Sequence, residues 1–254
     1  MKREAWLARL RPLAGVAVVI AGWGLLHASR AVDPVLLPSP GEAFTAFWKG
    51  LAEGTLWSDF WKTIVRTLLS FALALAFAVP LGIVLGASRK LYESIEFAID
   101  FFRSTPASAM FPLFLVIFGV GEKTKIAVAA FGAGLVILFN VAYGVMGVRK
   151  QRQLAARVMG APRYRVLTDV TLLEAMPQVF VGMRSGVSLA LVIVIVAEMF
   201  IGSTDGLGQR VMNAQLIFDM PEMYAAIFAA GLLGYAMNLV FILAERKWVH
   251  WGGK

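Results

Sequence analysis

Long runs of apolar residues separated by short polar connections dominate the chain. There are six of them, at 12–28, 63–87, 95–118, 126–147, 179–202 and 224–245. Crossing the hydrocarbon core of a bilayer takes about twenty mainly apolar residues, which is close to the length of each run. The pattern predicts an all-α polytopic membrane protein with six transmembrane helices.

The first run allows two interpretations. Several basic residues precede it and the apolar stretch is short, as in a secretory signal peptide. No clean small-residue cleavage site follows at residues 27–31. We therefore expect a retained signal anchor, in which residues 1–30 form the N-terminus and the first transmembrane helix.

Lys and Arg are distributed unequally between the two sets of connections. One set of helix ends carries fifteen: Lys2, Arg3, Arg9, Arg11, Arg89, Lys90, Arg149, Lys150, Arg152, Arg157, Arg163, Arg165, Arg246, Lys247 and Lys254. The other carries seven: Arg30, Lys49, Lys62, Arg66, Lys123, Lys125 and Arg210. Because basic connections are retained in the cytoplasm, both termini, the loop at 148–177 and the tail at 246–254 are expected there.

Composition agrees with a membrane protein. The chain is 59% hydrophobic, with a mean hydropathy of +0.74, against about 45–50% apolar residues in soluble domains. Its net charge of +8 is accounted for by the topology of the basic connections and requires no nucleic-acid partner.

The external segment 31–62 contains a second kind of helix. Ser39 and Glu42 have the spacing of a capping box, and Pro40 suits a first helical turn. The aromatic and apolar positions after them recur at helical spacing, at Phe44, Phe47, Trp48 and Leu51. We expect a short amphipathic helix at the outer interface, acting as an anchor in preference to a substrate-binding element.

Polar residues inside the apolar runs are candidates for a substrate pathway, because such residues in a membrane commonly have a function. They are Asp100, Arg103, Ser104, Thr105, Ser108, Asn140, Tyr143, Arg184, Ser185, Ser188, Glu198 and Asn238. Asp100 and Arg103 are three residues apart, so a local ion pair is the favoured interpretation. Glu198 has no basic neighbour at helical spacing; it is interpreted either as a gate residue or, preferably, as a brace for the following turn.

Pro106 and Pro112 break the third run, and we place the constriction of a pathway near this kink and Asn140. Met110, Phe111 and Phe114 form either an apolar gate or, more commonly at this spacing, simple packing. Glycine pairs such as Gly182 and Gly186 are expected to be close-packing positions between helices.

Signatures of catalysis are missing from the sequence. The chain has no Cys and two His, His27 and His250, so a metal site is not expected. The segment GVGEKTK at 119–125 lacks the Gly-Lys-Thr core of a phosphate-binding loop. The chain is therefore predicted to be non-catalytic, with its energy supplied from elsewhere.

The polar island at 148–177 has the pattern of a helix, a turn and a second helix. Residues 151–159 favour a helix, Gly160 can adopt a left-handed conformation that ends it, and Pro162 suits the start of the next. The small residues Ala155, Ala156, Gly160 and Ala161 predict a corner that another protein could approach closely. A solvated basic loop that only determines topology is the alternative.

The run LAARVMGAPRYRVLTDVTLLEAMP resembles the EAA loop of ABC importer permeases. Ala155, Ala156 and Gly160 match that pattern, as do Val170 and Leu172 after a nine-residue spacer. Leu154 stands in place of the family glutamate, and Leu173 in place of its proline. The segments LPSPGEAFTAF, RSTPASAMFPLFLVIFGVGEKTKI and VAEMFIGSTDGLG resemble the nitrate, sulfonate, taurine and bicarbonate permeases, so that the similarity extends over about residues 36–245.

This resemblance implies a type I, MetI-like permease fold with a core domain at 63–245. It also implies a bacterial inner-membrane complex of two copies of the chain, two ATPase subunits that bind ATP and Mg, and an external binding protein, periplasmic or lipid-anchored. The residues expected to couple to the ATPase are Ala155, Ala156, Arg157, Gly160, Ala161 and Arg163. Those expected along the pathway are Arg103, Ser104, Ser108, Asn140, Tyr143, Ser188 and Glu198.

Two other functional classes predict different sequence features. An ion-coupled secondary carrier predicts inverted repeats and ionisable clusters at the midplane, and neither is found by inspection. A membrane enzyme predicts a convergent acid-base or metal constellation. The sequence does not distinguish between two classes of substrate: anions such as sulfonate, nitrate or bicarbonate, and a neutral or aromatic vitamin precursor.

Overall fold

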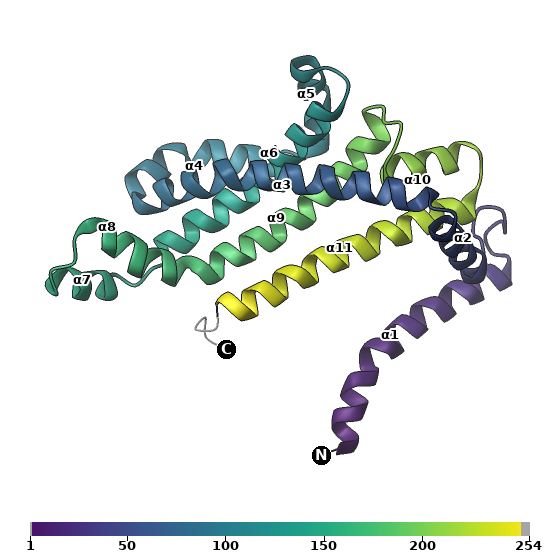
Figure 1. The fold of residues 1–254 in the computed structure, drawn as a ribbon, viewed down its shortest axis with the longest axis horizontal. Helices are drawn as coiled ribbons and strands as arrows, with labels where there is room; N and C mark the ends of the chain where they lie inside the picture. The colour runs from purple at the N-terminus through teal and green to yellow at the C-terminus, as the bar shows by residue number, and fades with distance from the viewer. Residues whose placement is uncertain (1, 250–254) are drawn as a thin grey trace.

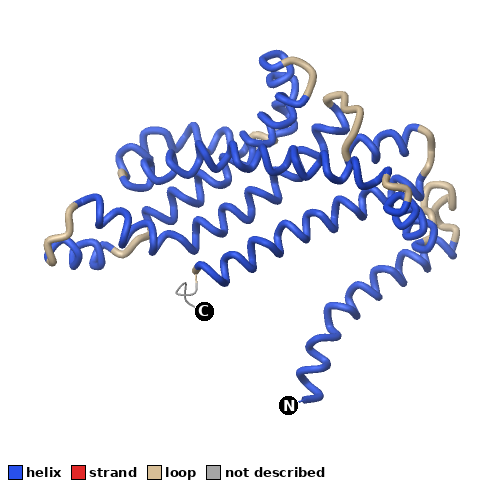
Figure 2. Tube along the Cα trace, viewed as in Figure 1, coloured by secondary structure: helices blue, strands red, loops and turns tan. Residues whose placement is uncertain are grey.

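The computed structural model describes residues 2–249, with side chains from residue 14 onward, and this part of the chain contains helices and loops but no strands (Figures 1 and 2). The basic residues at positions 2, 3, 9 and 11, together with 250–254 of the predicted tail, lie outside the described side chains. The elements are α1 (Lys2–Ser29), α2 (Pro40–Ala52), α3 (Thr55–Ala87), α4 (Arg89–Ser104), the 3-10 helix η1 (Ala107–Met110), α5 (Phe111–Phe118), α6 (Glu122–Met146), α7 (Lys150–Val158), α8 (Arg163–Arg165), the π-helical turn η2 (Val166–Leu172), α9 (Leu173–Phe200), α10 (Leu207–Leu216) and α11 (Met220–Trp248).

Four segments of the described chain are long and apolar enough to cross a membrane. They are Thr55–Ala87, Glu122–Met146, Arg163–Phe200 and Met220–Trp248, and they contain or largely overlap four of the six predicted runs. The third run is instead a bent pair, in which α4 and the segment Ala107–Phe118 meet at 93°. The apolar part of α1, Ala14–Ser29, is shorter than the 18 residues of a full span. Within the residues whose side chains are described, length and composition thus support four spans, or five with the bent pair. The first of the six predicted runs begins at residue 12, outside that range.

The bend lies where the prolines predicted a break, but it is a sharp turn and not a local kink. Pro106 lacks an amide hydrogen and disfavours helix in the residue before it. Thr105 accordingly adopts an extended conformation, with φ −80° and ψ 125°, and ends α4.

Helix α6 lies between α3 and α9 at the centre of the bundle and packs along both. Gly82 and Gly86 of α3 face α6, where an added Cβ at Gly86 would come within 2.6 Å of the Ala142 carbonyl oxygen. Gly182 and Gly186 of α9 approach the opposite side of α6 in the same way. Small residues four positions apart allow membrane helices to approach closely, as the sequence predicted for the α9 pair.

Replacing Gly86 with Val should therefore loosen the packing of α3 on α6. Overpacking of a close contact costs about 1–3 kcal/mol, and we expect a lower melting temperature of the purified protein in detergent. Gly231→Val in α11 is the matched control, since no atom lies within 4 Å of an added Cβ there. Equal melting temperatures for the two variants would contradict the close-packing interpretation.

The predicted amphipathic helix is confirmed as α2. Ser39 and Glu42 form a complete capping box, with the Ser39 amide donating to Glu42 Oε2 at 2.7 Å. The hydrogen bonds from the Ser39 backbone and hydroxyl hold the pKa of Glu42 below its usual value. The inner face of α2 buries Ala43 and Phe47, and Phe47 makes an edge contact with Phe228 of α11.

Candidate functional site

The corner between α7 and α8 lies at the far tip of the bundle, opposite α2 and α10 (Figure 1). Gly160 has a φ of +83°, so it adopts the predicted left-handed conformation. Its amide donates to the Arg157 carbonyl at 2.9 Å, and the Ala161 amide donates to the Ala156 carbonyl at 3.0 Å. Pro162 then precedes the short helix α8. The helix, turn and helix predicted from the sequence are confirmed.

The corner presents a different surface from the one expected. Ala156 is buried at 8% exposure, so its side chain packs inside the loop and is not available for contact with a partner. Ala155 is exposed and Ala161 is half-buried. The most prominent side chains are apolar and larger: Leu154, Val158 and Met159 are 56%, 88% and 82% exposed. We call these three residues the apolar tip.

Helix α7 contacts the start of α9 and the π-helical turn before it. Arg152 forms an ion pair with Glu174 at 3.3 Å, and Gln153 donates from Nε2 to Thr171 Oγ1 at 3.2 Å. Since Glu174 belongs to α9, this ion pair joins the coupling loop to that long helix. The sequence did not indicate Glu174 as the anchor.

Two of the predicted pathway residues, Arg103 and Tyr143, are joined through Phe139 in one group on α4 and α6. The Arg103 guanidinium lies 4.5 Å above the Phe139 ring and pairs with Asp100 at 3.2 Å, which confirms the predicted ion pair. Phe139 in turn contacts Tyr143, with ring centroids 4.3 Å apart.

Asn140, also on α6, extends this group toward α9. The side chain of Gln178 donates from Nε2 to Asn140 Oδ1 at 2.8 Å. Gln178 was not among the predicted residues, although it is a polar side chain in the first turns of α9. We call Arg103, Phe139, Asn140, Tyr143 and Gln178 the polar face.

The remaining pathway candidates lie apart from this group. Ser104 and Ser108 are exposed on either side of the bend at Pro106. Ser188 donates to the Arg184 carbonyl of its own helix at 3.1 Å. Among the gate candidates, Phe111 is buried in a core cluster with Val128 and Ala129, so it serves packing.

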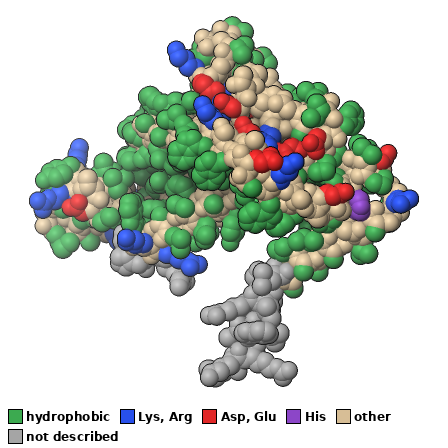
Figure 3. All heavy atoms as spheres, turned by 45° about the vertical axis from the view of Figure 1, so that its right-hand side comes forward, with side chains coloured by type: hydrophobic (Ala, Val, Ile, Leu, Met, Phe, Trp, Pro, Cys, Tyr) green, Lys and Arg blue, Asp and Glu red, His purple; other side chains and the backbone are tan. Residues whose placement is uncertain are grey.

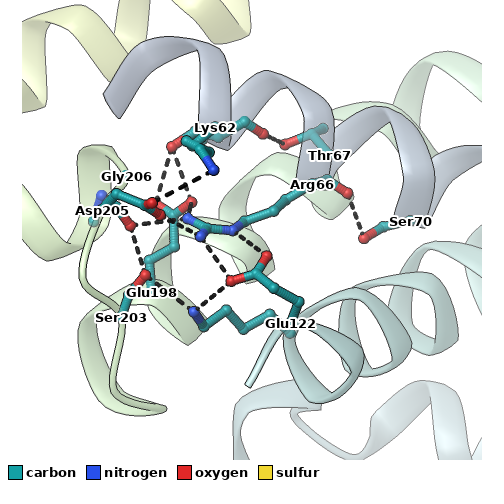
Figure 4. Close-up of polar contacts among 12 residues, drawn as sticks. Lys62, Arg66, Thr67, Ser70, Glu122, Glu198, Ser203, Asp205 and Gly206 are labelled. Carbon is teal, nitrogen blue, oxygen red and sulfur yellow. Dashed lines mark hydrogen bonds and ion pairs between the residues drawn. The ribbon is translucent and has the colours of Figure 1, made fainter. Parts of the chain in front are cut away.

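Glu198 lies in an ionic cluster with Arg66, Glu122 and Asp205 (Figure 4). The cluster is near the end of α9, whereas the coupling loop precedes the start of that helix (Figure 1). It has no exposed surface, and in this conformation it lies inside the protein and not on an accessible pathway surface. It accepts a hydrogen bond from Arg66 Nη1 at 2.8 Å and another from the Gly208 amide at 2.9 Å. The interpretation that Glu198 braces the following turn therefore agrees with its contacts.

Arg66 is the centre of this ionic cluster. It is 4% exposed and contacts carboxylates from three segments: Glu122 of α6 at 2.7 Å from Nε, Glu198 of α9, and Asp205 of the loop before α10. Its Nη1 also donates to the Asp205 backbone carbonyl at 2.9 Å. A planar guanidinium with five donors can hold several acceptors at once, which suits this junction.

Two further residues complete the ionic cluster. Lys125, 2% exposed, pairs with Glu122 and donates to Ser203 Oγ, both at 3.0 Å. Thr63 donates to Glu198 and accepts from the Leu207 amide at 2.9 Å. Helices α3, α6 and α9 and the loop that leads to α10 are thereby joined at one point.

A second ion-pair group lies beside the first. Arg210 of α10 pairs with Asp59 at 2.9 Å and with Glu222 of α11. Burial alone would lower the pKa of Arg210, but the hydrogen bonds to these two carboxylates raise it above its usual value. Acidic and basic side chains also lie next to one another in one band of the surface in Figure 3.

Arg66 was not predicted as a site residue, although the sequence contains a pattern that indicates its role. Thr63, Arg66, Thr67 and Ser70 follow one another at helical spacing and are the polar residues of α3 that are fully or almost fully buried. A buried polar stripe inside an apolar run indicates a contact with other polar groups.

A bundle of apolar helices with one protruding polar loop is the structure of a polytopic membrane protein. The chain belongs to the family described as binding-protein-dependent transport system inner membrane component, which it matches over residues 78–247. It is a non-catalytic subunit that forms the translocation path of an ABC importer for small solutes.

Relatives and solved structures agree with this assignment. The chain is 34% identical over 239 residues to an ABC transporter permease protein of Brucella melitensis, covering 94% of this chain and 96% of that one. It is 30% identical over 248 residues to an aliphatic sulfonates transport permease protein of Escherichia coli, covering 98% and 94%. A methionine ABC transporter in an inward-facing conformation shares its fold, with a TM-score of 0.67 at 22% identity over 77% of this chain and 98% of that one.

Proposed function

We propose that two copies of this chain form the pathway for a small organic or oxyanionic solute such as a sulfonate, nitrate or bicarbonate. An external binding protein delivers the solute, and two separate ATPase subunits bind ATP and Mg and dock on the coupling loop at 148–177. The protruding corner at Gly160, tied to α9 through Glu174, is the observation that carries this proposal. The similarity to a permease named for aliphatic sulfonates supports the substrate class.

The polar face supports a pathway between the two copies. Arg103, with 44% of its side chain exposed, lies in the bent pair of apolar helices, and a charge there is costly against lipid. The side of the bundle that carries Arg103 and Gln178 therefore turns toward the second copy or a water-filled path. Ser104 and Ser108 border the same route at the bend.

The distribution of basic residues supports the orientation. The coupling loop belongs to the set of helix ends with fifteen Lys and Arg, which we assign to the cytoplasm of a bacterial inner membrane together with both termini. The ionic cluster then lies at the outer end, where the binding protein docks, and α2 lies at the outer interface.

Substitution of Gly160 with Trp tests the coupling loop. The left-handed backbone disfavours any residue with a Cβ, and the indole ring would obstruct the corner. We expect ATP hydrolysis stimulated by the binding protein to fall by about tenfold, as for the loss of a central interface contact. The measurement uses the permease reconstituted with its ATPase subunit.

Gly54→Trp provides a matched control for that experiment. Gly54 has a φ of +78° and open space around it, like Gly160, but it lies in the turn between α2 and α3 at the other end. This variant should keep docking of the ATPase subunit and its basal ATP hydrolysis, neither of which involves the outer end. If Gly160→Trp retained both ATPase docking and stimulated hydrolysis, the coupling role of the corner would be wrong.

A further inference from the structure

A cavity of about 800 Å³ lies between the coupling loop and the ends of α3, α4 and α6. Gly86 and Arg89 border it on one side, Tyr92 and Tyr143 line its wall, and residues of α7 and η2 close the other side. Ligand sites in proteins have volumes of about 300–1,000 Å³, so the cavity is large enough for a headgroup or a small organic anion.

Helix α7 divides its side chains between this cavity and the apolar tip. Lys150, Gln153 and Arg157 line the cavity, at the three- and four-residue spacing of one helical face. Leu154, Val158 and Met159 are exposed and do not belong to the lining. Both arginines among the expected ATPase-coupling residues, Arg157 and Arg163, thus border the cavity.

The charges of the cavity lining are not balanced. Four basic residues line it, Arg89, Lys150, Arg157 and Arg163, against the two carboxylates Glu93 and Glu96. Glu93 is already engaged by Arg89 at 2.7 Å. Within the part of the chain whose side chains are described, no ion pair involves Lys150, Arg157 or Arg163. An excess of unpaired basic groups around a concave site favours an anion.

Phosphate is the anion whose geometry suits such a lining. Guanidinium groups bind phosphate oxygens through paired hydrogen bonds, and lysine adds a compact charge. Basic pockets between membrane helices at the cytoplasmic side bind the phosphates of lipid headgroups. Lys and Arg side chains are visible at this end of the molecule in Figure 3.

We propose that this cavity is a binding site for a phosphate-bearing anion, either the headgroup of an anionic lipid or a free phosphate compound. Arg157, Arg163 and Lys150 hold the phosphate, and Tyr92 and Tyr143 line the wall beside it. Because the bound group would bridge the coupling loop and the turn between α3 and α4, it would hold the loop against the bundle.

The test compares two double variants of the purified full-length chain. Arg157→Gln with Arg163→Gln removes two charges from the cavity lining. Arg165→Gln with Arg246→Gln removes the same charge from exposed positions outside the lining. Native mass spectrometry measures retention of phosphatidylglycerol, and a thermal-shift titration in neutral detergent measures binding of inorganic phosphate.

We expect the cavity variant to bind its anion roughly tenfold to thirtyfold more weakly than the unsubstituted chain, while the control variant binds normally. If the cavity variant loses phosphatidylglycerol and the control variant keeps it, the ligand is the lipid headgroup. If the cavity variant keeps phosphatidylglycerol but loses the thermal shift with inorganic phosphate, the ligand is a free anion. Equal behaviour of the two variants with both probes, or no binding of either probe to the unsubstituted chain, overturns the proposal.

Lys150→Gln serves as a second variant in case the double substitution disturbs the loop. It removes one positive charge from the cavity without altering the corner at Gly160. It should weaken binding of the same probe by a smaller factor than the double substitution does. Unchanged binding in this variant, in a protein that elutes normally on size exclusion, would also count against the site.

Discussion

Replacing Arg66 with Ala is expected to destabilise the protein severely, by about 3–5 kcal/mol, the range measured when one partner of a buried ion pair is removed. The substitution leaves Glu198 buried with no exposed surface and without its charged partner. It also removes the ion pairs that join Glu122 and Asp205 to Arg66 of α3. The measurement is the melting temperature and the size-exclusion profile of the purified protein in detergent.

Arg66→Lys should restore only part of this stability. A lysine keeps the positive charge, but its single nitrogen cannot reproduce the planar fork that reaches carboxylates from three segments. Arg89→Ala is the matched control: Arg89 also pairs with a glutamate at 2.7 Å, but its side chain is 86% exposed. A loss for Arg66→Ala no larger than that for Arg89→Ala would refute the structural role of the ionic cluster.

Val158→Asp is expected to have the second large effect, on assembly and not on folding. Val158 is 88% exposed at the apolar tip, so the change leaves the packing of the chain intact. If the ATPase subunit docks there, a buried and unpaired carboxylate at the interface should weaken docking by about thirtyfold or more. Binding of the ATPase subunit to the purified permease measures this directly.

Val120→Asp is the control for docking. Val120 is 78% exposed in the connection between α5 and α6, near the opposite end of the bundle from the coupling loop. It should leave docking unchanged and the melting temperature close to normal. Unchanged docking in Val158→Asp would show that the ATPase contacts a different part of the coupling loop.

The exposed position of Leu154 is relevant to the same contact. The resembling family has a glutamate there, and in this chain Leu154 adds to the apolar tip with 56% exposure. At this position the chain therefore presents apolar surface where the family pattern has a charge. This is consistent with a docking surface that relies on burial of Val158 and Met159 more than on charge.

Most of the helices could be predicted from the sequence, because apolar runs, capping residues and helix-breaking residues act locally. Ser39 and Glu42 mark the start of α2, Pro106 marks the break after α4, and Gly160 ends the helical turn after α7. Each of these signals depends on backbone conformations within a few residues. The sharp 93° bend was not predictable, since proline determines that a helix ends but not the direction in which the chain continues.

The partners of polar residues were predictable only where they are close in sequence. The Asp100 and Arg103 pair is three residues apart and was expected. Arg66 meets Glu122, Glu198 and Asp205 at separations of 56, 132 and 139 residues. No local rule connects such positions, so Glu198 looked isolated until the packing of α3 against α6 and α9 was known.

By itself, the sequence determined that this protein is a helical membrane protein with a protruding basic loop, because hydropathy, charge asymmetry and turn residues are properties of short segments. Its likeness to permeases came from the motifs of that loop and of the segments around it. Tertiary structure decided which side of that loop faces outward, where Glu198 finds its charged partner, and that the basic side of α7 borders a cavity. These features depend on how helices distant in the sequence pack against one another, since packing determines which side chains are buried and which charges are neutralised.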